Sequence, residues 1–407
     1  MATGVEDCTM AAGGSGEVRL SRRVVELGVE RAFEVLAAAR RLEATGRKII
    51  HLEAGEPDFP TPPHIVEAGM RALRDGHTTY TQSSGIQPLR VAIAESMRDR
   101  GVVAEPDTVV VVPGSKLALF HVLTALLEEG DEVLLPDPAY PAYAAVTTFA
   151  GGRVVPYIVD PDTGVDVDAI ASRITPKTRV LVINSPHNPT GHALDLAALT
   201  RLAELAERHD LIVLADEIYR QLTFDGPPPV SIASLPGMAA RTVIVDGFSK
   251  AYAMTGWRLG YGVMPVWLAE AVGKLVNNSV ACTAPFVQIA GIAALQGPQD
   301  AVYAMRDEFK ARRDLIVARL NAISGVHCAT PGGAFYVLPD IRAALGRNTR
   351  RSAESVADSL LYDHGVGCLA GSAFGHAGHG FLRFSYVRSR SDLSTAMDRM
   401  ETVIMAL

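Results

Sequence analysis

Cysteine is scarce in this sequence. Only four occur among 407 residues, Cys8, Cys282, Cys328 and Cys368. They lie far apart and include no CxxC pair, so the sequence indicates neither a zinc site nor a disulfide framework. We therefore expect no metal centre, and the composition fits the reducing cytoplasm.

Long apolar runs and clusters of positive charge are also missing. No apolar segment approaches the roughly 18 residues that a membrane-spanning helix needs, so we expect no membrane crossing. The formal net charge is −7 at pH 7, and the lysines and arginines are dispersed along the chain. Because binding to nucleic acid requires concentrated positive charge, no nucleic-acid partner is expected.

The sequence does have ample apolar material for a large core. The sequence is 48% hydrophobic and 20% charged, which is typical of a globular protein. Its 407 residues exceed what one hydrophobic core usually supports, so we expect two domains. Residues 1–19 are rich in Gly, Ala and Ser and match neither a signal peptide nor a transit peptide. We expect this tail to be disordered.

Short apolar runs alternate with helical segments through most of the chain. Expected strands lie at 109–112, 132–135, 153–159, 179–183, 211–215, 242–245 and 258–263. Expected helices include 24–42, 63–74, 116–127, 194–208, 284–295 and 301–320. Apolar strands that alternate with helices predict a largely parallel sheet covered on both faces. Ligands should then gather at the carboxyl ends of the strands.

Lys250 follows the apolar run 242–245, within the segment GFSKAYAMTGWRLG at 247–260. A lysine at the end of a buried strand enters a cleft, where burial lowers its pKa and allows the amine to form a Schiff base with an aldehyde. Arg258 adds a planar cation that suits a phosphate, and a phosphorylated aldehyde describes pyridoxal phosphate. Taken alone, a lysine in a glycine-rich loop is more often on the surface, so the assignment depends on the other motifs.

Polar residues follow three of the expected strands and should converge on one site. Asn188 lies in NSPHNPTG after one strand, Asp216 ends the next, and Ser249 and Lys250 follow a third. A carboxylate that ends an apolar strand needs a cation, and a protonated pyridine nitrogen would be one. Alternatively, Asp216 and Glu217 could form an empty metal site or cap a helix.

Two further elements indicate anion binding. Gly114 and Ser115 form a strand-to-helix turn whose free backbone N–H groups suit a phosphate. Any βα unit has this shape, so the turn is informative only if another ligand such as Arg258 converges on it. Arg383 lies in an apolar strand, where it needs an anion, and a substrate carboxylate would satisfy it. The alternative for Arg383 is a structural salt bridge.

These motifs, in this order, resemble the class I aminotransferases, which are fold type I pyridoxal-phosphate enzymes, and within them the aspartate aminotransferase-like subgroup. The segment GEPDF at 55–59 adds to the resemblance, which covers the chain from Val24 to the C-terminus. It implies an α/β fold with a mostly parallel seven-stranded sheet between helices, in a large domain at 56–295. A smaller α+β domain would combine residues 20–55 with residues 296–407.

The resemblance also implies roles for residues that say little by themselves. Tyr140 would stack on the cofactor ring, and Tyr219 and Asn188 would hydrogen-bond its phenolic oxygen. Gly55 would line the site for the substrate carboxylate. Tyr80 would reach across a homodimer to the cofactor phosphate of the partner, so that the two active sites are shared.

The reaction implied is transfer of an amino group between an L-amino acid and a 2-oxo acid, with Lys250 binding the cofactor and moving the proton. Lys116, beside the phosphate turn, would help bind the distal carboxylate of aspartate or glutamate, with 2-oxoglutarate as a partner oxo acid. The same motifs also serve β- or γ-elimination or replacement, for instance on S-adenosylmethionine, because all these reactions begin at the same Cα carbanion. A transcription regulator with this fold would carry a DNA-binding domain ahead of it, and only a short acidic tail is present.

Overall fold

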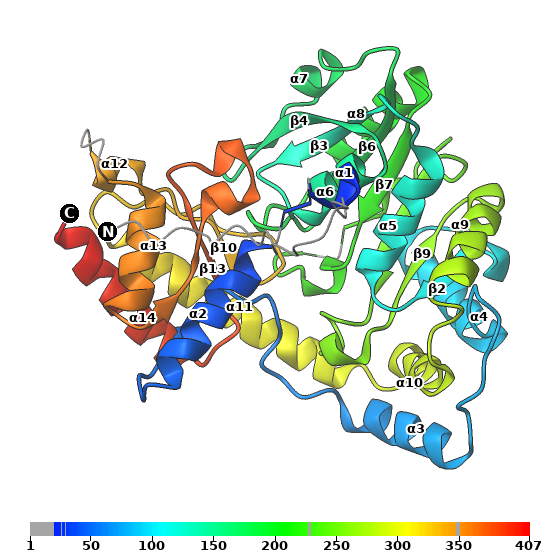
Figure 1. The fold of residues 1–407 in the computed structure, drawn as a ribbon, viewed down its shortest axis with the longest axis horizontal. Helices are drawn as coiled ribbons and strands as arrows, with labels where there is room; N and C mark the ends of the chain where they lie inside the picture. The colour runs from blue at the N-terminus through cyan, green and yellow to red at the C-terminus, as the bar shows by residue number, and fades with distance from the viewer. Residues whose placement is uncertain (1–19, 26, 29, 227–228, 347–350) are drawn as a thin grey trace, which may run out of the picture.

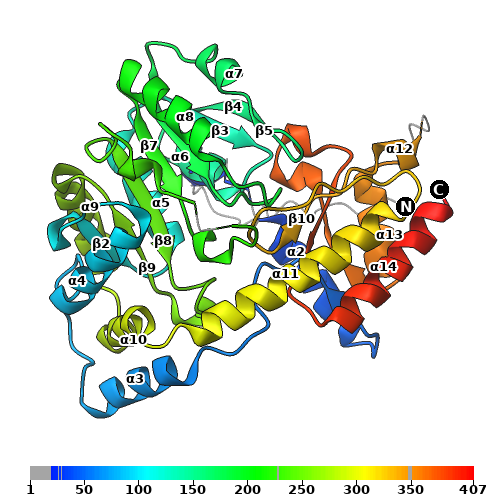
Figure 2. The ribbon, with the colours of Figure 1, turned by 180° about the vertical axis from the view of Figure 1, so that it is seen from behind.

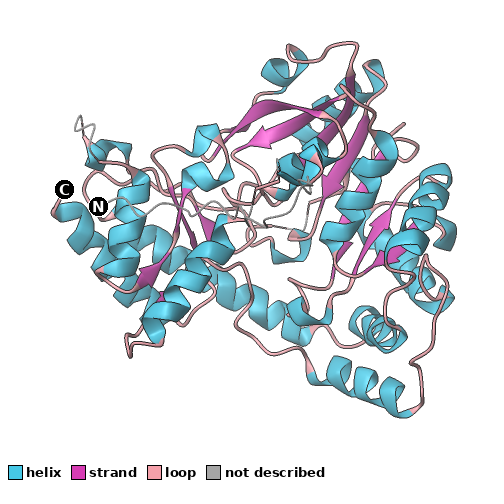
Figure 3. Cartoon of the chain, viewed as in Figure 1, coloured by secondary structure: helices cyan, strands magenta, loops and turns pink. Residues whose placement is uncertain are grey.

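The computed structural model describes residues 20–25, 27–28, 30–226, 229–346 and 351–407. The tail expected to be disordered, residues 1–19, lies outside them. Figure 1 shows a large body of strands and helices beside a smaller one, and Figure 3 shows strands in each. Among these residues, no helix is both long enough and apolar enough to cross a bilayer.

The larger body is built on one sheet with the strand order β2-β9-β8-β7-β6-β3-β4-β5. Its strands are β2 (Val109–Val112), β3 (Glu132–Asp137), β4 (Arg153–Asp160), β5 (Gly164–Val165), β6 (Thr178–Asn184), β7 (Ile212–Asp216), β8 (Thr242–Gly247) and β9 (Gly260–Val263). Neighbouring strands from β8 to β4 are parallel, whereas β9 and β5 run antiparallel to their neighbours. The expected mostly parallel sheet is confirmed. Its seven expected strands are present, and the described sheet adds an eighth, β5, whose two residues are too short to leave a sequence pattern.

Alternate residues of each strand enter different hydrophobic clusters. Val110 and Val112 pack on one face of the sheet, whereas Val109 and Val111 pack on the other. The first face is covered by α5 (Ser115–Leu126), α6 (Ala142–Phe149) and α9 (Val266–Ser279). The second is covered by α3 (Pro63–Arg74), α4 (Gln87–Ser96), α7 (Val167–Ala171), α8 (Leu196–Arg208) and α10 (Pro285–Gln296). Burial on both faces explains why the strands are apolar throughout.

The smaller body contains a three-stranded antiparallel sheet in the order β10-β13-β12 and a parallel pair, β1 and β11. These strands are β1 (Ile50–His51), β10 (Tyr336–Val337), β11 (Val366–Gly367), β12 (Leu369–Ala370) and β13 (Leu382–Ser385). Its helices are α2 (Arg31–Glu43), α11 (Asp300–Asn321), α12 (Arg342–Leu345), α13 (Ala353–Tyr362) and α14 (Arg390–Met405). Figure 2 shows α11 running from beside α10 into this body, and its residues belong to clusters of both bodies.

Two expected elements differ from the structure. The single helix expected at 24–42 is divided into α1 (Arg22–Val25) and α2, because Gly28 disfavours a helix and Glu30 has extended backbone angles (φ −63°, ψ 118°). The strand expected at 258–263 begins only at Gly260. Arg258 instead has φ +55°, in the left-handed region, and ends a short 3₁₀ turn.

Candidate active site

A cavity of about 500 Å³ lies where residues of the large sheet's carboxyl edge meet residues of the smaller body. Of the thirteen site residues expected from the sequence, eleven line it: Gly55, Ser115, Lys116, Tyr140, Asn188, Asp216, Tyr219, Ser249, Lys250, Arg258 and Arg383. Gly114 lies directly behind the lining, against Arg258. The expected convergence of three strand ends is therefore observed.

Lys250 follows β8 and points into the cavity. Its Nζ donates a hydrogen bond of 2.6 Å to the carbonyl oxygen of Gly55 and lies 5.8 Å and 5.6 Å from the ring centroids of Tyr219 and Phe335. Burial in these surroundings lowers the pKa of Lys250 to about 8. At neutral to mildly alkaline pH, a substantial fraction of this amine is uncharged and nucleophilic.

Asp216 ends β7, one strand away from Lys250. Its Oδ2 accepts a hydrogen bond of 2.7 Å from the Tyr143 hydroxyl, and its Oδ1 accepts one of 3.2 Å from the backbone N–H of Ile218. Burial raises the pKa of Asp216 to about 6, although both hydrogen bonds favour the charged form. Sequence reasoning missed Tyr143, although it follows Tyr140 by three residues at the start of a helix and so lies near the same site.

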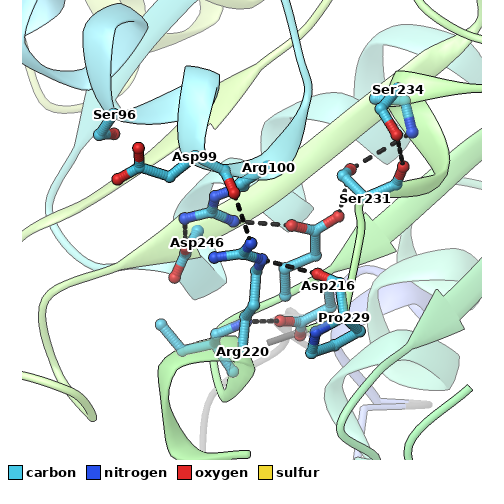
Figure 4. Close-up of polar contacts among 12 residues, drawn as sticks. Ser96, Asp99, Arg100, Asp216, Arg220, Pro229, Ser231, Ser234 and Asp246 are labelled. Carbon is cyan, nitrogen blue, oxygen red and sulfur yellow. Dashed lines mark hydrogen bonds and ion pairs between the residues drawn. The ribbon is translucent and has the colours of Figure 1, made fainter. Parts of the chain in front are cut away.

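A buried ion network includes Glu217, the residue after Asp216, and Asp246 of the neighbouring strand β8 (Figure 4). Arg100 donates hydrogen bonds to Glu217, at 2.7 Å, and to Asp246, and a third of 3.2 Å to the Tyr261 hydroxyl. Arg100, Glu217 and Asp246 are each less than 7% exposed. Sequence reasoning missed Arg100 because it follows Arg98 and Asp99 in a charged stretch that looks solvent-facing. Within the described ranges, no group of three His, Cys, Asp or Glu side chains could hold a metal.

The turn at Gly114 and the side chain of Arg258 form one corner of the cavity. Gly114 has φ +87°, and a Cβ there would lie 2.2 Å from Nη2 of Arg258. Arg258 is held by a hydrogen bond of 2.8 Å from its Nη1 to the Thr255 carbonyl. The guanidinium therefore faces the N-terminus of α5, where backbone N–H groups lack helical partners, and the corner is suited to an anion.

Arg383, in β13, is 4% exposed and enters the cavity from the smaller body. It donates to the backbone carbonyl of Glu53 and, at 3.4 Å, to Oδ1 of Asn188, while its Nε is buried with no partner among the described residues. Burial lowers its pKa. The structural salt bridge considered above is not found among the described residues, so this cation has no carboxylate of its own there.

The tyrosines expected around the cofactor ring also line the cavity. Tyr219 shares a hydrogen bond of 2.9 Å with the Tyr336 hydroxyl, and Tyr140 packs edge-on against Tyr143 with ring centroids 5.6 Å apart. The backbone N–H of Asn188 donates to Oδ1 of Asn184 at 2.8 Å. Tyr336, which belongs to the short strand β10, also lines the cavity.

Sequence reasoning missed one lining residue, and it assigned another residue to the partner's site rather than to this one. Glu30, which was not singled out, lines the cavity and accepts hydrogen bonds from Lys116 and Tyr140. Tyr80, which was singled out, is 88% exposed and lies outside the lining of the cavity within this chain. A role for Tyr80 across a dimer remains a prediction.

Comparisons with known proteins agree with this arrangement. Residues 47–400 match the family described as aminotransferase class I and II. The chain is 38% identical to the aspartate aminotransferase of Geobacillus stearothermophilus over 394 residues, 96% of this chain and 100% of that protein. It is 40% identical to aromatic-amino-acid aminotransferase 2 of Thermococcus litoralis over 362 residues, 88% and 92% of the two chains.

Solved structures show the same fold. The aspartate aminotransferase of Thermus thermophilus with maleate has a TM-score of 0.89 at 36% identity, with 95% of this chain and 99% of that chain covered. An alanine aminotransferase of Pyrococcus furiosus has a TM-score of 0.90 at 35% identity, with 96% and 100% covered. This chain belongs to the class I and II aminotransferases, a family that uses pyridoxal phosphate, and it is an aminotransferase.

Proposed function

We propose that Lys250 binds pyridoxal phosphate covalently, in a cavity that also admits the substrate. A volume of about 500 Å³ is within the range of ligand pockets. The residues fit such a group, because Arg258 and the turn at Gly114 form an anion corner for the phosphate. The buried Nε of Arg383, which has no partner among the described residues, is left for the substrate. When bound, the cofactor supplies an electron sink for negative charge that develops at the substrate Cα.

Asp216 would accept a hydrogen bond from the protonated pyridine nitrogen and so keep that ring positively charged. Tyr143 supports this role, because its hydrogen bond fixes the orientation of the carboxylate. Tyr219 and Asn188 donate to the phenolic oxygen, and Tyr140 covers one face of the ring. These donors hold the ring in one orientation relative to Lys250.

The phosphate binds to Arg258, to the backbone of Gly114 and Ser115 and to the hydroxyls of Ser115 and Ser249, with Lys116 beside it. Arg383 binds the substrate carboxylate, together with Gly55 and Asn188. A planar guanidinium matches a carboxylate with two parallel hydrogen bonds, which fixes the direction of the Cα–H bond. Released from the cofactor, the uncharged amine of Lys250 removes the proton from the substrate Cα.

The substrate that this site fits best is a dicarboxylic amino acid, aspartate or glutamate, with 2-oxoglutarate as a partner oxo acid. The observation that carries this proposal is that two cationic residues, Lys116 on α5 and Arg383 on β13, line the same cavity. Each carboxylate of such a substrate then has its own cation. The aspartate aminotransferases among the relatives of this chain support the assignment.

The proposed substrate is tested by measuring single half-reactions of the holoenzyme with different amino acids. Holoenzyme is mixed with aspartate, glutamate, alanine, phenylalanine or S-adenosylmethionine, and conversion of pyridoxal phosphate into pyridoxamine phosphate is followed by absorbance. We expect the two dicarboxylic amino acids to react fastest. Lys116→Met should lower their rates about tenfold, the factor for about 1.4 kcal/mol, and leave the rate with alanine unchanged. An equal effect on alanine would exclude this role of Lys116, and product release without pyridoxamine phosphate would indicate elimination or replacement.

We propose in addition a homodimer in which Tyr80 completes the partner's phosphate site, and a cytoplasmic location. The exposed aromatic side chain of Tyr80 supports the first. The cysteines Cys282, Cys328 and Cys368, which form no disulfide, are compatible with the second.

A further inference from the structure

Glu30 places a carboxylate at the mouth of the cavity, on the residue just before α2. Its Oε1 accepts a hydrogen bond of 2.5 Å from Nζ of Lys116 and one of 3.1 Å from the Tyr140 hydroxyl. The side chains of Glu30 and Lys116 are 23% and 48% exposed. The ion pair is therefore partly accessible to solvent and to a ligand.

This carboxylate satisfies a requirement of Lys116. Lys116 is the second residue of α5, and the positive end of a helix dipole disfavours a cation there unless an anion is close. Glu30 is that anion in the structure. Glu30 thus pairs with the same ammonium group, that of Lys116, to which the proposed function assigns the distal carboxylate of the substrate. The carboxylates of Glu30 and of the substrate therefore compete for Lys116.

The two partners come from different parts of the fold. Lys116 and Tyr140 belong to the large body, whereas α2, which Glu30 precedes, packs against β11 and β12 of the smaller body. Phe33 and Leu36 of the same helix also line the cavity. Withdrawal of Glu30 thus requires movement of one side chain or of the start of one helix, and leaves the large sheet undisturbed.

We propose that Glu30 determines which side chains the site accepts. With an uncharged side chain in the site, Glu30 stays on Lys116 and keeps this region electrically neutral. A dicarboxylic substrate displaces it, because one ammonium group does not compensate two carboxylates in a partly buried site. The inference rests on the proposed function, and it explains how a site built for dicarboxylic substrates could also admit an uncharged side chain.

Binding of non-reacting acids to the holoenzyme tests this directly. Dissociation constants for succinate and for butanoate, which lacks the second carboxylate, are measured by calorimetry in wild type, Glu30→Gln and Glu34→Gln. Glu34 is the matched control, since it lies in the first turn of the helix that Glu30 precedes, pairs with Arg31 and is 50% exposed. Glu30→Gln should tighten succinate about fivefold, the factor for about 1 kcal/mol in a partly exposed ion pair, and leave butanoate within about twofold. Glu34→Gln should change neither.

A double-mutant cycle with Lys116→Met completes the test. In that background Glu30→Gln should no longer tighten succinate, because the cation for which the carboxylates compete is absent. The inference is overturned if Glu30→Gln shifts both acids equally, weakens succinate, is reproduced by Glu34→Gln, or still tightens succinate without Lys116. If Lys116→Met weakens succinate but Glu30→Gln has no selective effect, the role of Glu30 alone is wrong. If Lys116→Met leaves succinate binding and the glutamate half-reaction unchanged, the dicarboxylic specificity is wrong as well.

Discussion

Burial moves the pKa values of Lys250 and Asp216 towards each other, to about 8 and about 6. In both cases the charged form is disfavoured, since an ammonium loses its proton more easily and a carboxyl holds its proton more strongly in a dry site. The apoprotein therefore contains two groups whose charge costs free energy until a partner arrives. A covalent aldehyde for Lys250 and a pyridinium for Asp216 would remove both costs.

Lys250 should be the residue that borohydride labels. Reduction of the holoenzyme followed by peptide mapping is expected to place the cofactor on Lys250, and a label on another lysine would contradict the assignment. The rate at which apoprotein takes up pyridoxal phosphate should rise with pH and level off above about 8, because the uncharged amine is the reactive form. A rate that still climbs steeply between pH 9 and 10 would show an ordinary lysine.

Asp216→Asn should inactivate the enzyme and stabilise the apoprotein. Turnover is expected to fall at least about 100-fold, because an amide does not hold the pyridinium charge. The folded-state pKa of about 6 exceeds the ordinary 3.8, so the free energy of unfolding of wild-type apoprotein falls as the pH rises from 3.8 to about 6. The variant has no carboxyl group to ionise at this position, so its free energy of unfolding should not fall over this interval. The difference in free energy of unfolding between variant and wild type should therefore grow to about 3 kcal/mol by about pH 6 and then stay constant. Urea unfolding at several pH values measures it, and an advantage that does not vary with pH would contradict the argument.

At the scale of elements, the network around Arg100 joins the ends of β7 and β8 to the segment after α4. Arg100→Met leaves Glu217 and Asp246 buried without their shared cation, which should lower the free energy of unfolding by about 3–5 kcal/mol. The matched control is Arg98→Met, because Arg98 is exposed two residues away and should cost within about 0.5 kcal/mol. Equal losses in the two variants, measured by urea unfolding, would show that the network contributes little.

The elements that sequence reasoning found are those with a regular period. The strands of the large sheet follow from apolar runs such as 109–112, and the residues at their carboxyl ends, Asp216 and Lys250, follow from the topology. Glu30 and Arg100 could not be found this way, since each meets its partners across long stretches of chain and neither lies in an apolar run. The domain boundaries at 55/56 and 295/296 remain predictions.

At the scale of the whole molecule, Tyr80 does not line the cavity of its own chain, so its proposed role requires a second copy of the chain. If the enzyme is a dimer with shared sites, Tyr80→Phe should preserve the dimer in sedimentation experiments but weaken pyridoxal phosphate binding roughly tenfold, as expected for one lost hydrogen bond to a charged group. Tyr303→Phe is the control, because Tyr303 is an exposed tyrosine on α11. An active monomer, or equal affinity in the two variants, would contradict the shared site.

The pairing of β1 with β11 places Ile50 beside Val366, although nearly the whole large body lies between them in the chain. During synthesis, β1 is made early and must wait for its partner until most of the protein has been translated, on the order of tens of seconds later. Gly55 follows β1 and Arg383 follows β11, so these two residues of the cavity can come together only after β11 has been made. The large sheet can fold before residues 366–383 have been made, whereas the pocket becomes complete only after them, so we expect the chain to bind the cofactor late in its synthesis.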